Sequence, residues 1–223
     1  MNRGRLGVWA WRIGILVAFL GAWEYLTGIK AISKTPGLYW IDPFFISRPS
    51  VIAQRFAYLT SDKVRLTIWQ MALSTIQSTL WGFLVGITTG FLAGLVLGRY
   101  ERPARILDPF IVAFNSLPRI ALVPLITMIF GFGLLAKIVL AWTFASLTPS
   151  ISFALIGVVV GEFIGGESGG GLGYLIIQSL GTLNAADMMV ALVVLGAIGI
   201  VMALGIRQIE SRLLRWRPEY QKR

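Results

Sequence analysis

The chain has 223 residues, of which 56% are hydrophobic and only 13% are charged. Average soluble domains carry about 25% charged residues, so about half of the usual solvating surface is missing. There is neither Cys nor His, which excludes disulfides, thiol chemistry and the common zinc sites. The net charge of +10 does not indicate nucleic-acid binding, because the basic residues collect at the ends of apolar runs.

Residues 1–65 are predicted to form an N-terminal anchor span and an outer loop. Basic residues precede an apolar core, but Trp23-Glu24-Tyr25 follows it in place of the small-residue cleavage site of a signal peptide. We therefore predict an uncleaved first span in residues 1–30. Residues 29–65 are polar enough to leave the membrane, and 49–56 are expected to form a short amphipathic helix at its surface.

Four runs contain no Asp, Glu, Lys or Arg: residues 66–98, 120–136, 138–161 and 188–206. A bilayer span needs roughly 17 to 25 apolar residues, which each run can supply. Four such runs favour an all-α, polytopic membrane protein with about five to six transmembrane helices over a soluble protein with a buried helix. Since both ends of the chain are basic, the positive-inside rule predicts an inner (plasma) membrane protein with both termini in the cytoplasm.

The first of these runs contains glycines at a strict four-residue spacing, which places them on one helix face. They are Gly82, Gly86, Gly90, Gly94 and Gly98. Small residues let two membrane helices approach closely, so we predict that this face packs against a helix of this chain or of a second copy. Near the start of the run, Gln70, Ser74 and Gln77 form a polar stripe. The stripe either lines a solute pathway or begins an amphipathic segment at the outer surface.

The run at residues 120–136 is interrupted at its beginning. Asn115, Pro118 and Pro124 break a helix that would otherwise be continuous, and Arg119 stands at the break. Broken helices at membrane depth are tolerated where the backbone faces protein or a water-filled cavity. We add Asn115, Ser116 and Arg119 to the candidate pathway residues. Arg119 could attract an anionic solute, or could pair with Asp108.

Residues 162–187 are expected to form a glycine-rich outer loop, because they contain three acids and no basic residue. A single crossing through 138–161 would put this loop inside. Two crossings would put the loop outside. Residues 133–165 would then form a hairpin that turns at Thr148-Pro149-Ser150, and each leg would have about 16 residues, or roughly 24 Å. The short legs favour one kinked helix, whereas the charge of the neighbouring loop favours two helices. A missing cytoplasmic connection between two helices would explain both observations.

Several motifs, taken in order along the chain, resemble permease subunits of ATP-binding-cassette (ABC) importers, especially the nitrate, sulfonate and taurine branch. Besides the glycine series they are Asp108-Pro109, Ser116-Leu117-Pro118, Pro124-Leu125, Phe130-Gly131-Phe132-Gly133 and Gly170-Gly171-Leu172-Gly173-Tyr174-Leu175. The resemblance implies a small, anionic sulfonate- or nitrate-like solute, a dimer with a second permease copy, cytoplasmic ATPase subunits and a periplasmic solute-binding protein. It implies no catalytic residue, metal or cofactor on this chain, since the ATPase partner uses the ATP.

The family's cytoplasmic Glu-Ala-Ala coupling segment has no match in this sequence. The resemblance places it between the two spans that meet at Pro149 and Ser150. We therefore expect an internal deletion at 149–150 within a permease domain of residues 66–210, followed by a basic cytoplasmic tail of residues 211–223. Such a chain would not couple ATP hydrolysis to import. The alternatives are a non-transporting permease remnant and a self-contained secondary transporter, although the sequence shows neither the repeats nor the paired intramembrane acids of the latter.

Overall fold

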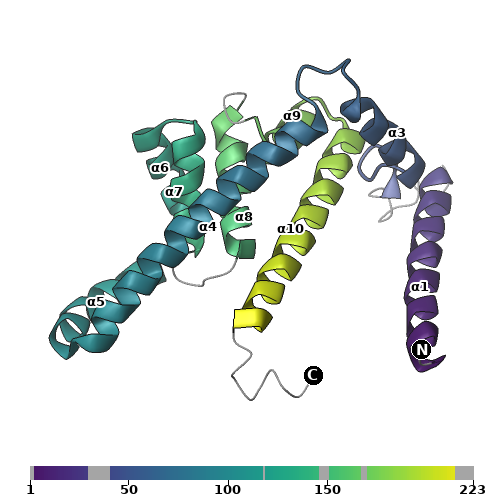
Figure 1. Cartoon of the computed structure of the whole chain (residues 1–223). Helices are drawn as coiled ribbons and strands as arrows, with labels where there is room; N and C mark the ends of the chain where they lie inside the picture. The colour runs from purple at the N-terminus through teal and green to yellow at the C-terminus, as the bar shows by residue number, and fades with distance from the viewer. Residues whose placement is uncertain (1–2, 30–40, 118, 146–150, 167–169, 214–223) are drawn as a thin grey trace. The chain divides into compact units, whose positions relative to one another are not determined.

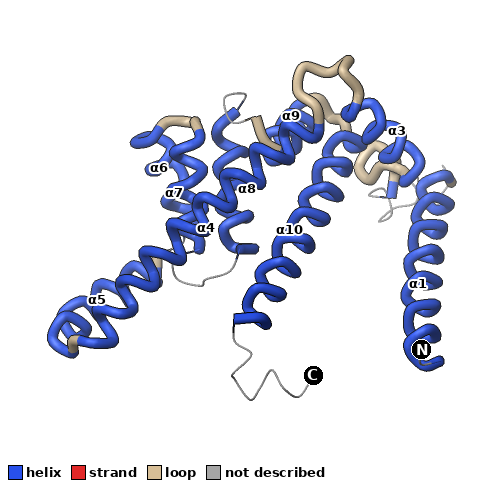
Figure 2. Tube along the Cα trace, viewed as in Figure 1, coloured by secondary structure: helices blue, strands red, loops and turns tan. Residues whose placement is uncertain are grey.

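The computed structural model describes residues 3–29, 41–117, 119–145, 151–166 and 170–213, and these contain helices and no strand (Figures 1 and 2). The all-α prediction is therefore confirmed for this part of the chain. The chain divides into two compact units. The smaller unit comprises residues 1–65 with 178–190, and the larger comprises 66–177 with 191–223.

In the smaller unit, polar contacts join α1 (Arg3–Gly28) to α3 (Pro49–Thr60). The Glu24 carboxylate accepts the Ser50 N–H at 3.0 Å and the Ser50 hydroxyl at 2.8 Å. It thereby caps an otherwise unsatisfied donor at the beginning of α3. Arg48, directly before α3, donates to the Thr27 carbonyl near the end of α1 at 3.2 Å, which adds a second contact between the two helices. The amphipathic helix lies where the sequence predicted it, with Pro49 in its first turn.

The same unit includes the end of α9 (Leu172–Gly181) and the first turn of α10 (Ala185–Leu213). Arg55 of α3 donates to Asp187 through Nε, at 2.6 Å, and through a second guanidinium nitrogen. This hydrogen bonding raises the pKa of Arg55. Asn184 accepts the Asp187 N–H at 3.2 Å, so the start of α10 is capped as well as paired.

The larger unit is built on α4 (Ile68–Arg99), which crosses a pair formed by α7 (Leu134–Ala145) and α8 (Ile151–Gly165). Figures 1 and 2 show this crossing. Buried side chains from the three helices form one core cluster: Phe83, Ala141, Ile151, Ala154 and Val158. The predicted helix break is present, since α5 (Glu101–Ser116) is followed by a short 3-10 helix, η2 (Arg119–Leu122), and then α6 (Val123–Phe130).

Close glycine contacts show that α7 and α8 form an antiparallel pair. A Cβ atom added to Gly157 would lie 2.7 Å from the Leu140 carbonyl oxygen. A Cβ atom added to Gly157 would lie closest to Leu140, one on Gly161 closest to Leu140 and then Lys137, and one on Gly165 closest to Phe132. The partner's number falls as the glycine's number rises, so the helices run in opposite directions. The structure thus has the hairpin and not one kinked helix; its turn lies outside the described residues.

The expected outer loop at residues 162–187 is wrong over most of its length. The helix α8 continues through Glu162 to Gly165, α9 forms at Leu172–Gly181, and α10 begins at Ala185. The prediction failed because it took Glu162 for a solvated residue that ends an apolar span. In the structure this side chain is fully buried, as the next section describes.

Within the described residues, two helices are long and apolar enough to cross a membrane: Ile68–Arg99 and Ala185–Ile209. Four shorter apolar helices span Arg119–Phe130, Leu134–Phe144, Ile151–Gly165 and Leu172–Gly181. Helix α1 has 26 residues, but Arg12 and Glu24 limit its uninterrupted apolar stretch to 11. Whether α1 spans the membrane stays a prediction.

Candidate functional site: a buried ion pair

A lysine and a glutamate face each other inside the larger unit. Lys137 of α7 and Glu162 of α8 are separated by 3.0 Å between Nζ and Oε1. The two residues are only 3% and 0% exposed. Ionisable side chains within apolar helices are costly to bury, and those that occur are generally paired and functional. This pair is therefore our leading candidate for a functional site.

Helix α4 supplies two hydroxyl groups to the pair. Lys137 Nζ donates to Ser74 Oγ at 3.2 Å. Thr75 Oγ1 lies 3.0 and 3.1 Å from the two carboxylate oxygens of Glu162. Lone charges in a low-dielectric interior require such additional partners. The ion pair thus joins α4, α7 and α8 at one point.

The beginning of α9 also attaches to this point. The Gly173 N–H donates to Glu162 Oε2 at 2.9 Å, and the Leu172 N–H donates to Thr75 Oγ1 at 3.0 Å. The first N–H groups of a helix have no partner within the helix. Here a carboxylate and a hydroxyl from distant parts of the chain satisfy two of them. The negative carboxylate also complements the positive end of the helix dipole.

The glycine-rich sequence before α9 makes this approach possible. A Cβ atom on Gly171 would lie 1.8 Å from Glu162 Oε1, and one on Gly173 would lie 2.7 Å from the Val159 carbonyl oxygen. No other residue fits at either position without displacing the carboxylate or the backbone. Gly166 and Gly170 have φ values of +56° and +50°. These lie in the left-handed region, which residues with a side chain adopt only uncommonly.

The predicted pathway residues do not gather at one place. Ser74 lies at the ion pair, whereas Gln77 of α4 is exposed. Gln70 belongs to the cap of α4, where its side chain accepts the Thr67 N–H at 2.9 Å. Asn115 and Ser116 end α5, and their side chains lie outside the described part of the structure.

Arg119 does not pair with Asp108, as one alternative had it. Its guanidinium donates to the Phe144 carbonyl at 2.9 Å, near the end of α7. A cation is favourable there, because the last carbonyls of a helix are unpaired and carry partial negative charge. Arg119 also borders a mostly apolar hollow of about 370 Å³, which Leu117, Ile120, Phe144, Phe153 and Ile156 line.

Lys137, Glu162 and Thr75 were not among the site residues predicted from the sequence. A signal was present: Lys137 separates two charge-free runs, and Glu162 directly follows the second. A charge enclosed by apolar residues on both sides requires a partner, so the two could have been paired. The glycines Gly157, Gly161 and Gly165 were missed too, although they have the same four-residue spacing as the series on α4.

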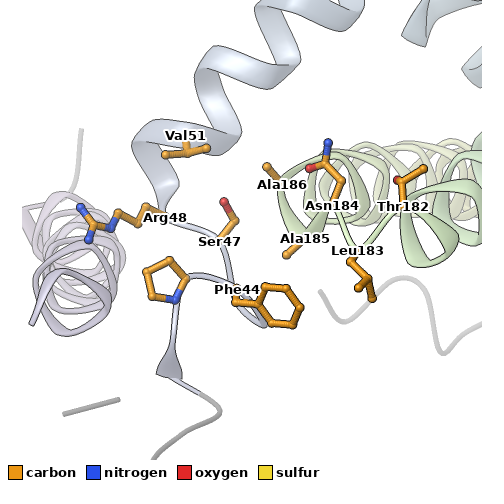
Figure 3. A pocket seen from close by; sticks show the side chains of 10 residues that line it. Phe44, Ser47, Arg48, Val51, Thr182, Leu183, Asn184, Ala185 and Ala186 are labelled. Atoms are coloured by element: carbon orange, nitrogen blue, oxygen red, sulfur yellow. The ribbon is translucent and has the colours of Figure 1, made fainter. Parts of the chain in front are cut away.

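The smaller unit carries a separate hollow of about 530 Å³ between the start of α3 and the turn that joins α9 to α10 (Figure 3). Ten residues line it: Pro43, Phe44, Ser47, Arg48, Val51, Thr182, Leu183, Asn184, Ala185 and Ala186. Leu183 is 64% exposed and has a φ of +53°, an uncommon conformation for a leucine. The described residues contain no group of three or more metal-ligating acids, and the chain has no Cys or His.

Comparison with known proteins finds relatives of this chain among transport permeases. The chain is 23% identical to the taurine transport system permease TauC of Escherichia coli, over 94% of this chain and 90% of TauC. The chain is a homologue of ABC importer permeases. It is also 21% identical to the aliphatic sulfonates transport permease SsuC of Bacillus subtilis, over 96% of this chain and 90% of that protein. No protein-family model and no solved structure matches the chain.

A third relative is an ABC transporter permease of Haemophilus influenzae, 26% identical over 66% of this chain and 79% of the relative. All of these relatives are transport permeases and not enzymes. The recognition of an ABC importer permease is therefore confirmed. So is the prediction of a polytopic membrane protein without catalytic activity of its own.

The alignments also reveal a difference in length. The alignment with TauC extends over 261 positions but includes 94% of 223 residues, which is about 210. For SsuC the corresponding values are 268 positions and about 214 residues, from 96% of the chain. For the Haemophilus influenzae permease they are 195 positions and about 147 residues, from 66%. In each alignment about 50 positions of the relative have no counterpart in this chain.

Proposed function

We propose that this chain is the membrane-spanning permease subunit that forms the pathway of an ABC importer for a small anionic solute, such as taurine or another sulfonate. The observation that carries the proposal is the alignment with TauC and SsuC over 94% and 96% of the chain. The named substrates of these two relatives contain a sulfonate group. Arg119 and the basic ends of the apolar runs supply positive charge that would attract such a solute.

The proposed assembly contains a second permease copy, cytoplasmic ATPase subunits that use the ATP, and a periplasmic solute-binding protein. Both termini would be cytoplasmic, which the clusters of basic residues at the two ends support. The turn at residues 182–187 would then face the periplasm. Its exposed Leu183 and the hollow beside it offer a surface for the binding protein.

We further propose that the residues missing relative to the relatives include the segment between α7 and α8 that would dock to the ATPase. Helices α7 and α8 have 12 and 15 residues, about 18 and 22 Å, whereas the hydrocarbon layer is about 30 Å thick. At most five residues, 146–150, connect them. A connection of that length leaves no room for a docking helix with its linkers, so import would not be coupled to ATP hydrolysis in this chain.

The test is reconstitution in liposomes with a cognate ATPase and binding protein, followed by uptake of radiolabelled taurine. We expect no ATP-dependent uptake by the chain as it stands, and uptake once the corresponding segment of TauC is inserted between Pro149 and Ser150. Uptake without the insertion, dependent on ATP and the binding protein, would overturn the loss of coupling but not the permease role. A folded insertion variant without uptake would overturn the permease role. Uptake without ATPase would favour a self-contained secondary transporter.

A further inference from the structure

We propose that the Glu162 carboxylate is a latch, which holds the amino-terminal end of α9 against α4 and α7, and that this end is released when the latch opens during solute transport. The release during transport rests on the proposed permease function. The latch itself does not, because it follows from the contacts of the buried ion pair.

The first argument is the convergence of donors on one carboxylate. Lys137 Nζ, Thr75 Oγ1 and the Gly173 N–H, which come from three different helices, all lie within 3.1 Å of a Glu162 oxygen. A carboxylate accepts through both oxygens and can therefore bind several donors at once. Glu162 is the group that all three share, so its removal would disconnect α9 from both α7 and α8 at this point.

The second argument concerns how α9 is held. Its first turns are buried, with Leu172 and Leu175 only 0% and 4% exposed, while Ile177 and Leu180 are 37% and 59% exposed. The contacts with Glu162 and Thr75 hold the amino-terminal end of α9, whereas near its other end Ser179 is buried. Loss of the polar contacts would leave mainly Leu172 and Leu175 to hold this end.

The third argument is the backbone on either side of α9. Gly166 and Gly170 precede the helix with positive φ values, and Leu183 follows it with a φ of +53°. Short segments with such residues are where large changes in backbone angles can be absorbed when an element moves as a rigid body. Helix α9 therefore has possible pivots at both ends and a polar attachment at one.

The fourth argument is energetic. A buried ion pair is seldom more stable than well-packed apolar side chains of the same volume, because the desolvation of both charges offsets their attraction. Apolar side chains would therefore hold α4, α7 and α8 together equally well. What an ion pair adds is a contact that can be broken and re-formed between defined partners, which is the property required of a latch.

The cysteine-free sequence allows a direct test of the latch. Leu172→Cys introduces a thiol at a fully buried position next to the carboxylate. We expect slow reaction with a water-soluble maleimide in the otherwise unchanged protein, and reaction at least tenfold faster when Glu162→Ala is added. Glu101→Gln is the matched control, because this glutamate is exposed and pairs with Arg105 on the surface. It should leave the rate unchanged.

Two further measurements, one on Glu162→Ala with an added carboxylate and one on a second variant, keep the test decisive if Glu162→Ala folds poorly. Formate or acetate added to Glu162→Ala should restore protection of the thiol by occupying the space beside Lys137 and the Gly173 N–H. The exchange Lys137→Glu with Glu162→Lys should not restore protection, because a lysine at position 162 offers the α9 N–H groups no acceptor. Equal protection in all variants, or full protection in the exchanged pair, would overturn the latch.

The release is tested by the same labelling during transport. In liposomes that take up taurine, Leu172→Cys should react at least threefold faster when the ATPase, ATP and the binding protein are all active than when ATP is omitted. If uptake proceeds at an unchanged labelling rate, the release is wrong and the latch is only structural. If there is no uptake in any variant, including the one with the TauC insertion, the proposed function fails while the labelling result on the latch stands.

Discussion

The glycine spacing of α4 continues from the part up to Gly86 into the part after it, here called its first and second halves, but the two parts meet different surroundings. In the first half, a Cβ atom on Gly82 would lie 2.1 Å from the Ala141 Cβ, and Gly86 is buried. In the second half, a Cβ atom added to Gly94 or Gly98 would meet nothing within 4 Å outside its own stretch of helix. A four-residue spacing thus selects one face of a helix, but it does not determine whether a partner covers that face.

The lengths of the helices explain the difference. Helix α4 has 32 residues, about 48 Å, whereas its partners α7 and α8 have 12 and 15. Trp142 of α7 still reaches Thr89, to which its indole N–H donates at 2.8 Å. Beyond Gly86 no residue of α4 is buried within the described structure. The uncovered half is therefore the part of α4 that the short hairpin does not reach.

The largest effect is expected from Lys137→Met, beside the covered half of α4. It leaves the Glu162 carboxylate buried without its cation, which typically costs about 3 to 5 kcal/mol. Thermal unfolding in detergent should show a large decrease in midpoint. Adding Glu162→Gln should recover much of the loss, because no unpaired charge remains. If Lys137→Met alone is as stable as the parent chain, Lys137 and Glu162 do not form a buried ion pair.

Gly82→Leu should be the next most damaging change, at about 3 kcal/mol, because the side chain would have to displace the backbone of α7. Gly82→Ala should be milder but still destabilising, since its Cβ atom already meets Ala141. The measurement is again the unfolding midpoint, with the yield of monodisperse protein as a second readout. Unchanged values for Gly82→Leu would mean that α4 and α7 are not in contact here.

Thr75→Val is expected to cost about 2 kcal/mol, less than either change above. The substitution keeps the shape of the side chain but removes the acceptor for the Leu172 N–H and a donor to Glu162, leaving a buried donor unpaired. Hydrogen exchange should accelerate at the start of α9 and not in α5. Ser78→Ala is a suitable control, because the Ser78 hydroxyl donates to the Ser74 carbonyl of its own helix and not to the ion pair.

The smallest effect on the chain itself is expected from Gly94→Leu, at about 0.5 kcal/mol or less, because the added side chain meets open space. Gly90 is exposed as well, so Gly90→Leu should likewise matter only where the face meets another chain. If the uncovered face binds a second permease copy, both variants should weaken the dimer in crosslinking or native mass spectrometry. A fall in monomer stability would show that the face is covered within the chain.

The amino-acid sequence by itself determined the local features of this protein. It predicted the apolar run that forms α4, the break between α5 and α6, the proline-initiated α3 and the glycine face of α4. These features depend on composition and on periodicities within about 20 residues, which are properties of a single element. The resemblance to ABC importer permeases likewise followed from motifs in their order along the chain.

Only the tertiary structure decided which parts meet. It paired Lys137 with Glu162, which is 25 residues away, and connected both to Thr75 on α4 and to the start of α9. It also showed that α8 uses Gly157 and Gly161 against α7, and that only the first half of α4 is covered. Periodicity cannot supply such information, because the partner of a buried charge or of a glycine face is chosen by the packing of distant segments. The acid that composition assigned to an outer loop is therefore, in the folded chain, the most completely buried charge of the described structure.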